Sequence, residues 1–157
     1  MKRVLTLFML LALVVVATPA PAQDGTLDKI RKSGVLTIGT RTGSPPFAYI
    51  NKDNQWVGFT IDLVEQLVKP AVEKEVGKPI KIEKKESAPP TRIPLLTANA
   101  VDLIAGTMTD TPQRRESVDF SLTFFYTGAQ FMVKKGSPIK GINDIGGKRV
   151  AAQQGST

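Results

Sequence analysis

Hydroxyl residues and an arginine follow a predicted buried strand, and together they could bind an anion. Residues 101–105, Val101-Asp102-Leu103-Ile104-Ala105, predict a buried strand, and Gly106-Thr107-Met108-Thr109 comes directly after it. Thr111 is suited to cap a helix, and Pro112 to occupy the first helical position. The free N–H groups of a helix start attract anions, and Arg114 adds a planar fork of donors that matches a carboxylate. Spacing alone favours the plainer alternative, an ordinary capped helix with a surface arginine.

A second segment has the same form. Residues 148–153 predict a strand, and Gln154-Gly155-Ser156-Thr157 follows it as the expected start of a helix. Ligands of open α/β sheets bind beyond the carboxyl ends of the strands. One carboxylate held between two such helix starts would account for both segments.

The composition removes several kinds of chemistry. The chain has no cysteine and no histidine, so disulfides are excluded, zinc and copper sites lose their usual ligands, and cysteine or serine–histidine nucleophiles lack their parts. No cofactor is implied. The formal net charge is +7, but lysines are interleaved with glutamates and no arginine-rich stripe with stacking aromatics occurs. We therefore expect no nucleic-acid partner.

The first residues predict export. Lys2 and Arg3 precede residues 4–17, which are apolar apart from Thr6, and Ala20-Pro21-Ala22 places small residues where a signal peptidase cleaves. The apolar run is shorter than the about 20 residues that a membrane-spanning helix needs. We expect a signal peptide over residues 1–22. Without a cysteine at the cleavage site we expect no lipid anchor, which favours a protein of the Gram-negative periplasm.

Strands and helices are predicted to alternate along the rest of the chain. Strands are expected at 35–39, 47–50, from 79, and at 101–105, with 124–133 and 148–153 as further apolar candidates. Helices are expected at 26–32, from Thr60 as N-cap with an interruption at Pro70, from 93, from 112 and at 142–145. Trp56 and Phe59 are expected to fill the core. The alternation predicts an α/β fold with a parallel sheet.

Several short sequence blocks occur in this chain. No single block is specific for a protein family, but their order and spacing together are. The blocks are Gly34-Val35-Leu36-Thr37-Ile38-Gly39 with Pro46-Phe47, Gly58-Phe59 with Ile61-Asp62-Leu63, Arg92-Ile93-Pro94-Leu95-Leu96, Val101-Asp102-Leu103-Ile104, Thr111-Pro112-Gln113-Arg114, Val118-Asp119-Phe120-Ser121, and Gly147-Lys148-Arg149-Val150 with Gln154-Gly155-Ser156-Thr157. On these blocks, residues 24–157 resemble the extracellular solute-binding proteins for polar amino acids, of the type II periplasmic binding fold. The resemblance implies two α/β lobes that close on a ligand about a hinge.

The resemblance also implies roles for single residues. Arg114 matches the arginine that pairs with the ligand's α-carboxylate. Thr107 and Thr109 match hydroxyl-bearing positions that contact the carboxylate or amino group. Thr157 matches a residue of the second lobe that completes the carboxylate site, and Gly106 stands where many members have serine.

Two further arginines bear on the choice of ligand. Arg41 and Arg92 match positions that are arginine in members resembling glutamate and aspartate receptors, and two cations suit a second carboxylate. Either arginine could instead point to solvent or pair with an acid such as Glu86. Pro89 also departs from the hydroxyl residue expected near such an arginine. We expect glutamate or aspartate to be preferred over a neutral polar amino acid.

The expected organisation is a near-complete first lobe at 23–128, a crossover at 129–133 and the start of a truncated second lobe at 134–157. The resemblance implies a monomeric, periplasmic substrate-binding component of an ABC amino-acid importer, which would bind a free amino acid and meet a membrane permease. A sensor module of a signalling receptor and a periplasmic dehydratase-type enzyme on the same fold are the alternatives. An enzyme needs a general acid or base in its site. The first lobe offers no obvious carboxylate for that role, so we expect no catalysis.

The signal peptide generates a first prediction. Periplasmic protein should begin at Gln23, or within one or two residues of it, because cleavage is expected after Ala22. Intact-mass measurement of the periplasmic fraction tests this. A membrane-bound species that keeps residues 1–22 would contradict it.

Overall fold

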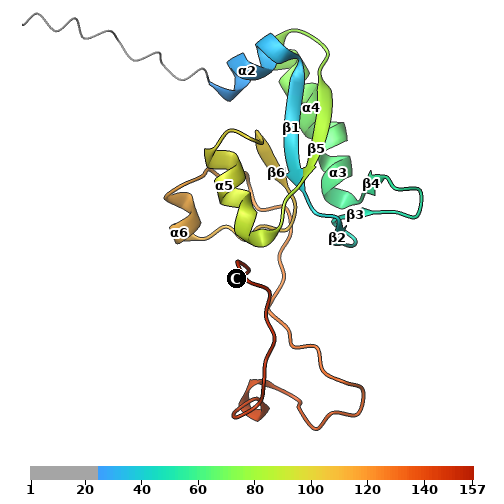
Figure 1. The fold of residues 1–157 in the computed structure, drawn as a ribbon, viewed down its shortest axis with the longest axis vertical. Helices are drawn as coiled ribbons and strands as arrows, with labels where there is room; N and C mark the ends of the chain where they lie inside the picture. The colour runs from blue at the N-terminus through green and yellow to red at the C-terminus, as the bar shows by residue number, and fades with distance from the viewer. Residues whose placement is uncertain (1–24) are drawn as a thin grey trace, which may run out of the picture.

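The computed structural model describes residues 25–157, a mixture of strands and helices followed by a segment that is almost without regular structure (Figure 1). The strands are β1 (Val35–Thr40), β2 (Gly43–Ser44), β3 (Ala48–Ile50), β4 (Trp56–Val57), β5 (Lys81–Glu86) and β6 (Leu103–Ala105). The helices are α2 (Thr26–Ser33), α3 (Phe59–Leu63), α4 (Lys69–Val76), α5 (Arg92–Thr97) and α6 (Pro112–Arg115), with 3₁₀ turns at Pro89–Thr91 and Ile142–Asp144. The predicted signal peptide lies outside the described residues.

A parallel sheet of order β5-β1-β6 forms the centre of the fold, and β2, β3 and β4 form a small antiparallel sheet beside it. β1 is the central strand, and all its residues after Val35 are buried. The core around it consists of Ile30, Leu36, Ile38, Ala48, Ile61, Val64, Val76, Ile80 and Ala105. Thr40 and Ala105 are paired at the ends of β1 and β6. The loops that follow these two strands therefore leave the same edge of the sheet.

The long helix that the sequence predicts is interrupted near Pro70, as expected. A π-helical turn at Val64–Val68 runs directly into α4, which carries the proline in its first turn. Proline has no N–H to donate, and a π-helical turn accommodates such a defect. The predicted N-cap at Thr60 is wrong, because α3 begins at Phe59 and the Thr60 hydroxyl donates to the carbonyl of Phe47 (2.9 Å). Within the described residues, every helix is too short or too polar to cross a membrane.

The two aromatic residues expected in the core have different environments. Trp56 packs against the core, and its indole N–H donates to the carbonyl of Arg41 (3.1 Å). The expectation for Phe59 is wrong, because 46% of its surface is exposed. Its ring instead meets those of Phe47 and Phe124, at centroid distances of 6.3 and 5.9 Å. The contact with Phe124 places the segment after α6 against the start of α3.

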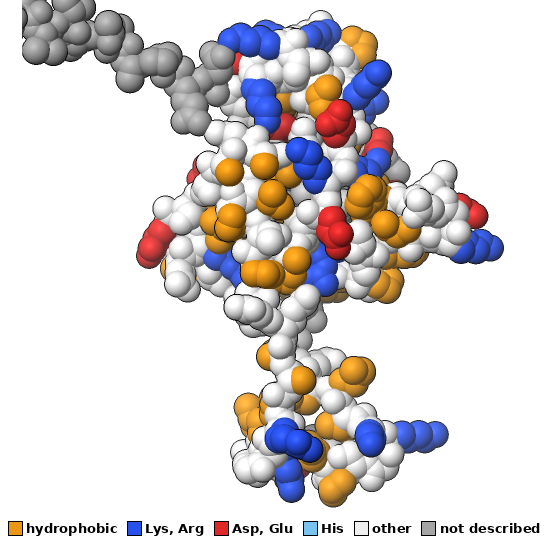
Figure 2. All heavy atoms as spheres, viewed as in Figure 1, with side chains coloured by type: hydrophobic (Ala, Val, Ile, Leu, Met, Phe, Trp, Pro, Cys, Tyr) orange, Lys and Arg blue, Asp and Glu red, His pale blue; other side chains and the backbone are white. Residues whose placement is uncertain are grey.

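The chain after α6 is almost without regular structure. Over residues 116–157, the 3₁₀ turn at Ile142–Asp144 is the only regular element, and it matches the predicted helical turn. The strands predicted at 124–133 and 148–153 are wrong, and Met132 is 99% exposed. Figure 2 shows hydrophobic side chains at the surface of this segment, in the lower part of the view. An apolar sequence forms a strand only where a neighbouring strand pairs with it, and this segment has no such neighbour.

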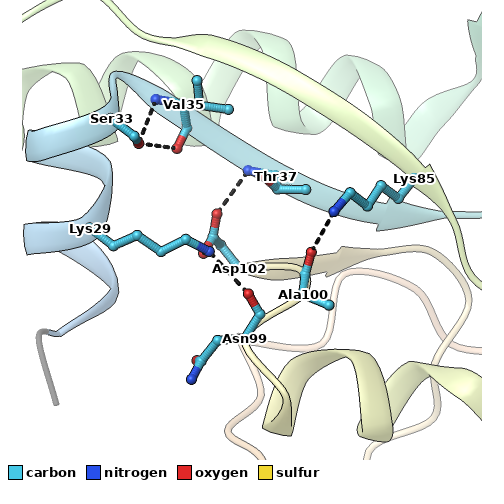
Figure 3. A network of polar contacts seen from close by, with 8 residues as sticks. All are labelled: Lys29, Ser33, Val35, Thr37, Lys85, Asn99, Ala100 and Asp102. Carbon is cyan, nitrogen blue, oxygen red and sulfur yellow. Dashed lines mark hydrogen bonds and ion pairs between the residues drawn. The ribbon is translucent and has the colours of Figure 1, made fainter.

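A buried carboxylate ties α2 to the sheet (Figure 3). Asp102 accepts a hydrogen bond from the backbone N–H of Thr37 (2.8 Å), and its own N–H donates to the carbonyl of the same residue (2.8 Å). Its other oxygen pairs with the ammonium of Lys29 at 2.7 Å, and that group also donates to the carbonyl of Asn99 (3.1 Å). One side chain thus fixes α2, β1 and the entry to β6 relative to one another.

This network generates a second prediction. Asp102→Ala should lower the free energy of unfolding by about 2 kcal/mol, because the Thr37 N–H and the Lys29 ammonium both lose a charged acceptor. Asp28→Ala is the matched control, since the Asp28–Arg31 pair is exposed on α2 and should be worth less than about 0.5 kcal/mol. Urea denaturation measures both changes. Equal losses would show that Asp102 is no more than a surface partner of Lys29.

Candidate ligand-binding site

Arg92 is the first residue of α5, and its side chain points inward. Only 4% of its surface is exposed. One terminal nitrogen donates to the carbonyl of Thr107 (2.7 Å), whereas Nε and Nη2 are buried and have no hydrogen-bond partner among the described residues. Burial, together with the charges of Arg41 and then Arg114, lowers the pKa of Arg92 to about 10. At neutral pH the group is still a cation, with one side of its guanidinium unpaired.

The turn before α5 sets the direction of Arg92. Pro89 and Pro90 lie in a 3₁₀ turn that runs directly into the helix. The Thr91 hydroxyl accepts from the N–H of Ala88 (3.1 Å), and the Thr91 N–H donates to the Ala88 carbonyl (3.0 Å). These bonds and the fixed φ of the two prolines hold the start of α5 in one orientation.

Arg41 leaves the end of β1, beside the loop that follows β6. Its backbone is held by Trp56, and its side chain reaches the amide oxygen of Gln153 at 3.5 Å. A Cβ at Gly106 would lie 3.7 Å from Cγ of Arg41, so the stem of the arginine packs over this glycine. Glu86, the acid weighed as an alternative partner, accepts from the Thr42 hydroxyl instead (2.9 Å). Among the described residues, no ion pair neutralises Arg41, Arg92 or Arg114.

Arg114 is positioned by the predicted helix cap. The Thr111 hydroxyl accepts from the N–H of Arg114 at 3.3 Å, which confirms Thr111 as the N-cap of α6. The guanidinium donates to the carbonyl of Thr109 (2.8 Å) and to that of Gly155 (3.1 Å). The neighbouring Arg115 turns away: its Nε donates to Asp110 at 2.7 Å, and this bond raises the pKa of Arg115 above its ordinary value.

The second predicted segment, residues 154–157, lies against the first, residues 106–114. The hydroxyls of Thr109 and Thr157 are 2.7 Å apart. Residues 153–156 form a turn instead of the expected helix start, with the Ser156 N–H and hydroxyl both directed at the carbonyl of Gln153 (3.2 and 2.6 Å). In Figure 1 the C-terminus accordingly lies close to α5.

The structure therefore gathers the six predicted site residues in two linked groups. Arg92, Arg41 and the Thr107 carbonyl form one group, and Arg114, Thr109 and Thr157 form the other. Two contributors were missed, Gln153 and Pro90. Gln153 lies 112 positions from Arg41 in the sequence, so no local pattern could connect them. The Pro89-Pro90 doublet is a visible signal, because two consecutive prolines restrict the backbone to a turn.

An apolar cavity of about 880 Å³ lies next to this site. It is bounded by β6 and residues 117–127, and Phe47, Leu103, Ile104, Phe124 and Phe125 are among its lining. Thr107 and Thr109 reach its border, whereas none of the three arginines lines it. The cavity thus shares Thr107 and Thr109 with the site, but not its three arginines.

Comparison with known proteins finds relatives that match most of this chain. A glutamate/aspartate import solute-binding protein of Salmonella typhimurium is 37% identical over 139 residues, which are 88% of this chain and 46% of the relative. A glutamine-binding protein of Geobacillus stearothermophilus is 39% identical over 143 residues, 90% of this chain and 53% of the relative. The structure of an ancestral cationic amino acid solute-binding protein is 37% identical, with a TM-score of 0.52 over 62% of this chain and 39% of that one.

The chain spans about half the length of the curated relatives it matches. The α/β fold predicted from the sequence is confirmed, and residues 25–157 cover part of the two-lobed architecture. Residues 36–155 match the family described as bacterial extracellular solute-binding proteins, family 3. The chain belongs to this family of bacterial extracellular solute-binding proteins.

Proposed function

We propose that the protein is the periplasmic substrate-binding component of an ABC amino-acid importer, and that it prefers glutamate or aspartate. The observation that carries the preference is the buried guanidinium of Arg92, whose Nε and Nη2 have no partner among the described residues. These two nitrogens form one edge of the planar group, and that edge matches a carboxylate with two parallel hydrogen bonds. Relatives named for amino-acid binding support the broader part of the proposal.

The ligand's α-carboxylate is assigned to the group around Arg114. One of its nitrogens is held by the carbonyl of Thr109, which keeps the guanidinium in place. The hydroxyls of Thr109 and Thr157 share one hydrogen bond, which uses one of their two protons. The second proton can donate to a carboxylate oxygen, and the Arg114 nitrogen bonded to the Gly155 carbonyl has a second N–H that can donate to the ligand. Thr107 adds an exposed hydroxyl nearby.

The side-chain carboxylate of the ligand is assigned to Arg92 and Arg41. Arg92 is out of water and carries a charge that Arg41 and Arg114 further repel, as its lowered pKa of about 10 reflects. A carboxylate relieves both costs because it supplies a counter-charge and two acceptors. The amide of glutamine supplies one acceptor and no charge. The arrangement therefore favours glutamate and aspartate over glutamine and asparagine.

Binding without catalysis is the better account of these side chains. Arginines remain protonated and have no lone pair to accept a proton, so they cannot act as the general base that an enzyme of this fold would need. The nearby carboxylate of Asp110 is engaged by Arg115. We propose that the ligand bridges the two lobes and shifts the protein to a closed form, which a membrane permease then recognises.

A third prediction concerns Arg114. Arg114→Ala in the whole mature protein should weaken binding of the preferred amino acid by about 3–5 kcal/mol, because the α-carboxylate loses its charged partner. Arg115→Ala is a closely matched control, since its guanidinium is exposed and faces Asp110. Calorimetric titration gives both affinities, and circular dichroism checks that both variants are folded. Equal affinities for the two variants would exclude the role of Arg114.

A fourth prediction concerns the choice of ligand. The wild-type protein should bind glutamate or aspartate at least ~10-fold more tightly than glutamine or asparagine, a difference of about 1.4 kcal/mol. Arg92→Met should narrow that difference and leave binding of neutral amino acids largely unchanged, because only the side-chain carboxylate loses its partner. Arg31→Met, on the exposed face of α2, is the control for loss of one positive charge. A wild-type preference for a neutral or basic amino acid would refute the acidic ligand while leaving amino-acid binding intact.

A further inference from the structure

Gly155 lies against the Pro89-Pro90 turn in close backbone contact. A Cβ at position 155 would be 2.8 Å from the nitrogen of Pro90, 3.0 Å from its Cα and 3.1 Å from the carbonyl carbon of Pro89. These are backbone atoms of a rigid turn, so they cannot rotate away as a side chain would. The φ of Gly155 is +75°, in the region that residues with a side chain rarely adopt. Glycine is therefore required at this position for two reasons, the close backbone contact and the positive φ.

The proline turn is suited to receive another backbone. Neither proline has an N–H, so a chain can cover the nitrogen of Pro90 without burying an unpaired donor. Thr91 fixes the turn through its hydrogen bonds to Ala88. The same turn orients Arg92, whose side chain is buried directly after it. The Pro89-Pro90 turn and the buried arginine of the cationic site are thus parts of one rigid unit.

Docking of Gly155 brings three groups onto the site at once. Its own carbonyl accepts from Arg114 at 3.1 Å. Thr157, two residues on, places its hydroxyl 2.7 Å from that of Thr109. Gln153, two residues before, reaches Arg41 at 3.5 Å. The turn over residues 153–156 is held by its own hydrogen bonds, so the segment arrives as a preformed unit.

We infer that the seating of Gly155 on the Pro89-Pro90 turn is the contact that determines how far the segment 153–157 closes over the arginines. The inference rests on the proposed amino-acid binding and adds a positioning role for Gly155 and Pro90. The contact involves backbone atoms that would touch no ligand side chain. It therefore raises the affinity for every amino acid that the site accepts, and it does not select among them.

A matched pair of glycine variants tests this inference. Gly155→Ala introduces both the backbone strain and the collision with Pro90. Gly147→Ala introduces the strain alone, because Gly147 has φ +68° and nothing within 4 Å of its Cβ position. Gly155→Ala should raise the dissociation constants of glutamate and glutamine by the same factor, at least ~10-fold, with their ratio unchanged. Gly147→Ala should leave both constants near the wild-type values.

A measurement without ligand separates this inference from the proposed function. The chain has no cysteine, so spin labels can be placed at Glu83→Cys and Ala151→Cys alone. Their distance distribution should be longer and broader in Gly155→Ala than in the wild type or in Gly147→Ala. A wild type that binds no amino acid would refute the proposed function, and the label distances would still decide the contact. Identical distributions in all three proteins, or a changed ratio of affinities in Gly155→Ala, would refute the inference.

Discussion

The site depends on the cost of keeping a guanidinium out of water without a counter-charge. Arg92 has one hydrogen bond to the Thr107 carbonyl, and its charge is opposed by two other arginines. Such an arrangement is unfavourable for the protein alone. The fold maintains it by anchoring each arginine separately, at the end of β1, at the start of α5 and behind the cap of α6. An anion that binds the folded state recovers this energy, so ligand binding and stability are linked.

Overall similarity does not determine the ligand in this family. Relatives named for glutamate/aspartate and for glutamine match the chain to a similar degree. The α-carboxylate is common to all amino acids, so the group around Arg114 can serve each of them. Discrimination must come from the few side chains that meet the other end of the ligand, for which we propose Arg92 and Arg41. A single buried charge is sufficient to separate an acid from its amide.

The parts of the fold that depend on local signals could be predicted from the sequence. The β-branched run of β1 and the Thr111-Pro112 helix start both form as expected. The predicted strand at 124–133 does not form, since a strand depends on a partner that composition does not reveal. Thr60 has the right side chain for a cap, but the Phe47 carbonyl takes its hydroxyl.

The site was predictable to a similar extent. The helix-start pattern singled out Arg114 and Thr109, but on spacing alone it favoured an ordinary capped helix, and their expected binding roles came from the resemblance to a family. Arg41 and Arg92 were identified through the resemblance to a family, because nothing in their local sequence requires them to converge. The contact of Gly155 with Pro90 escaped prediction altogether, since it joins backbone atoms of distant segments.

The bond from Trp56 to the carbonyl of Arg41 has an optical consequence. Trp56 is the only tryptophan of the chain, so essentially all of the emission excited at the red edge of the absorption band comes from one half-buried indole. That indole donates to the backbone of a residue whose guanidinium faces the site. A change in the charge or position of Arg41 alters the field at the ring and hence the emission wavelength. The protein thus contains its own fluorophore beside the cationic site, and its spectrum reports that one location.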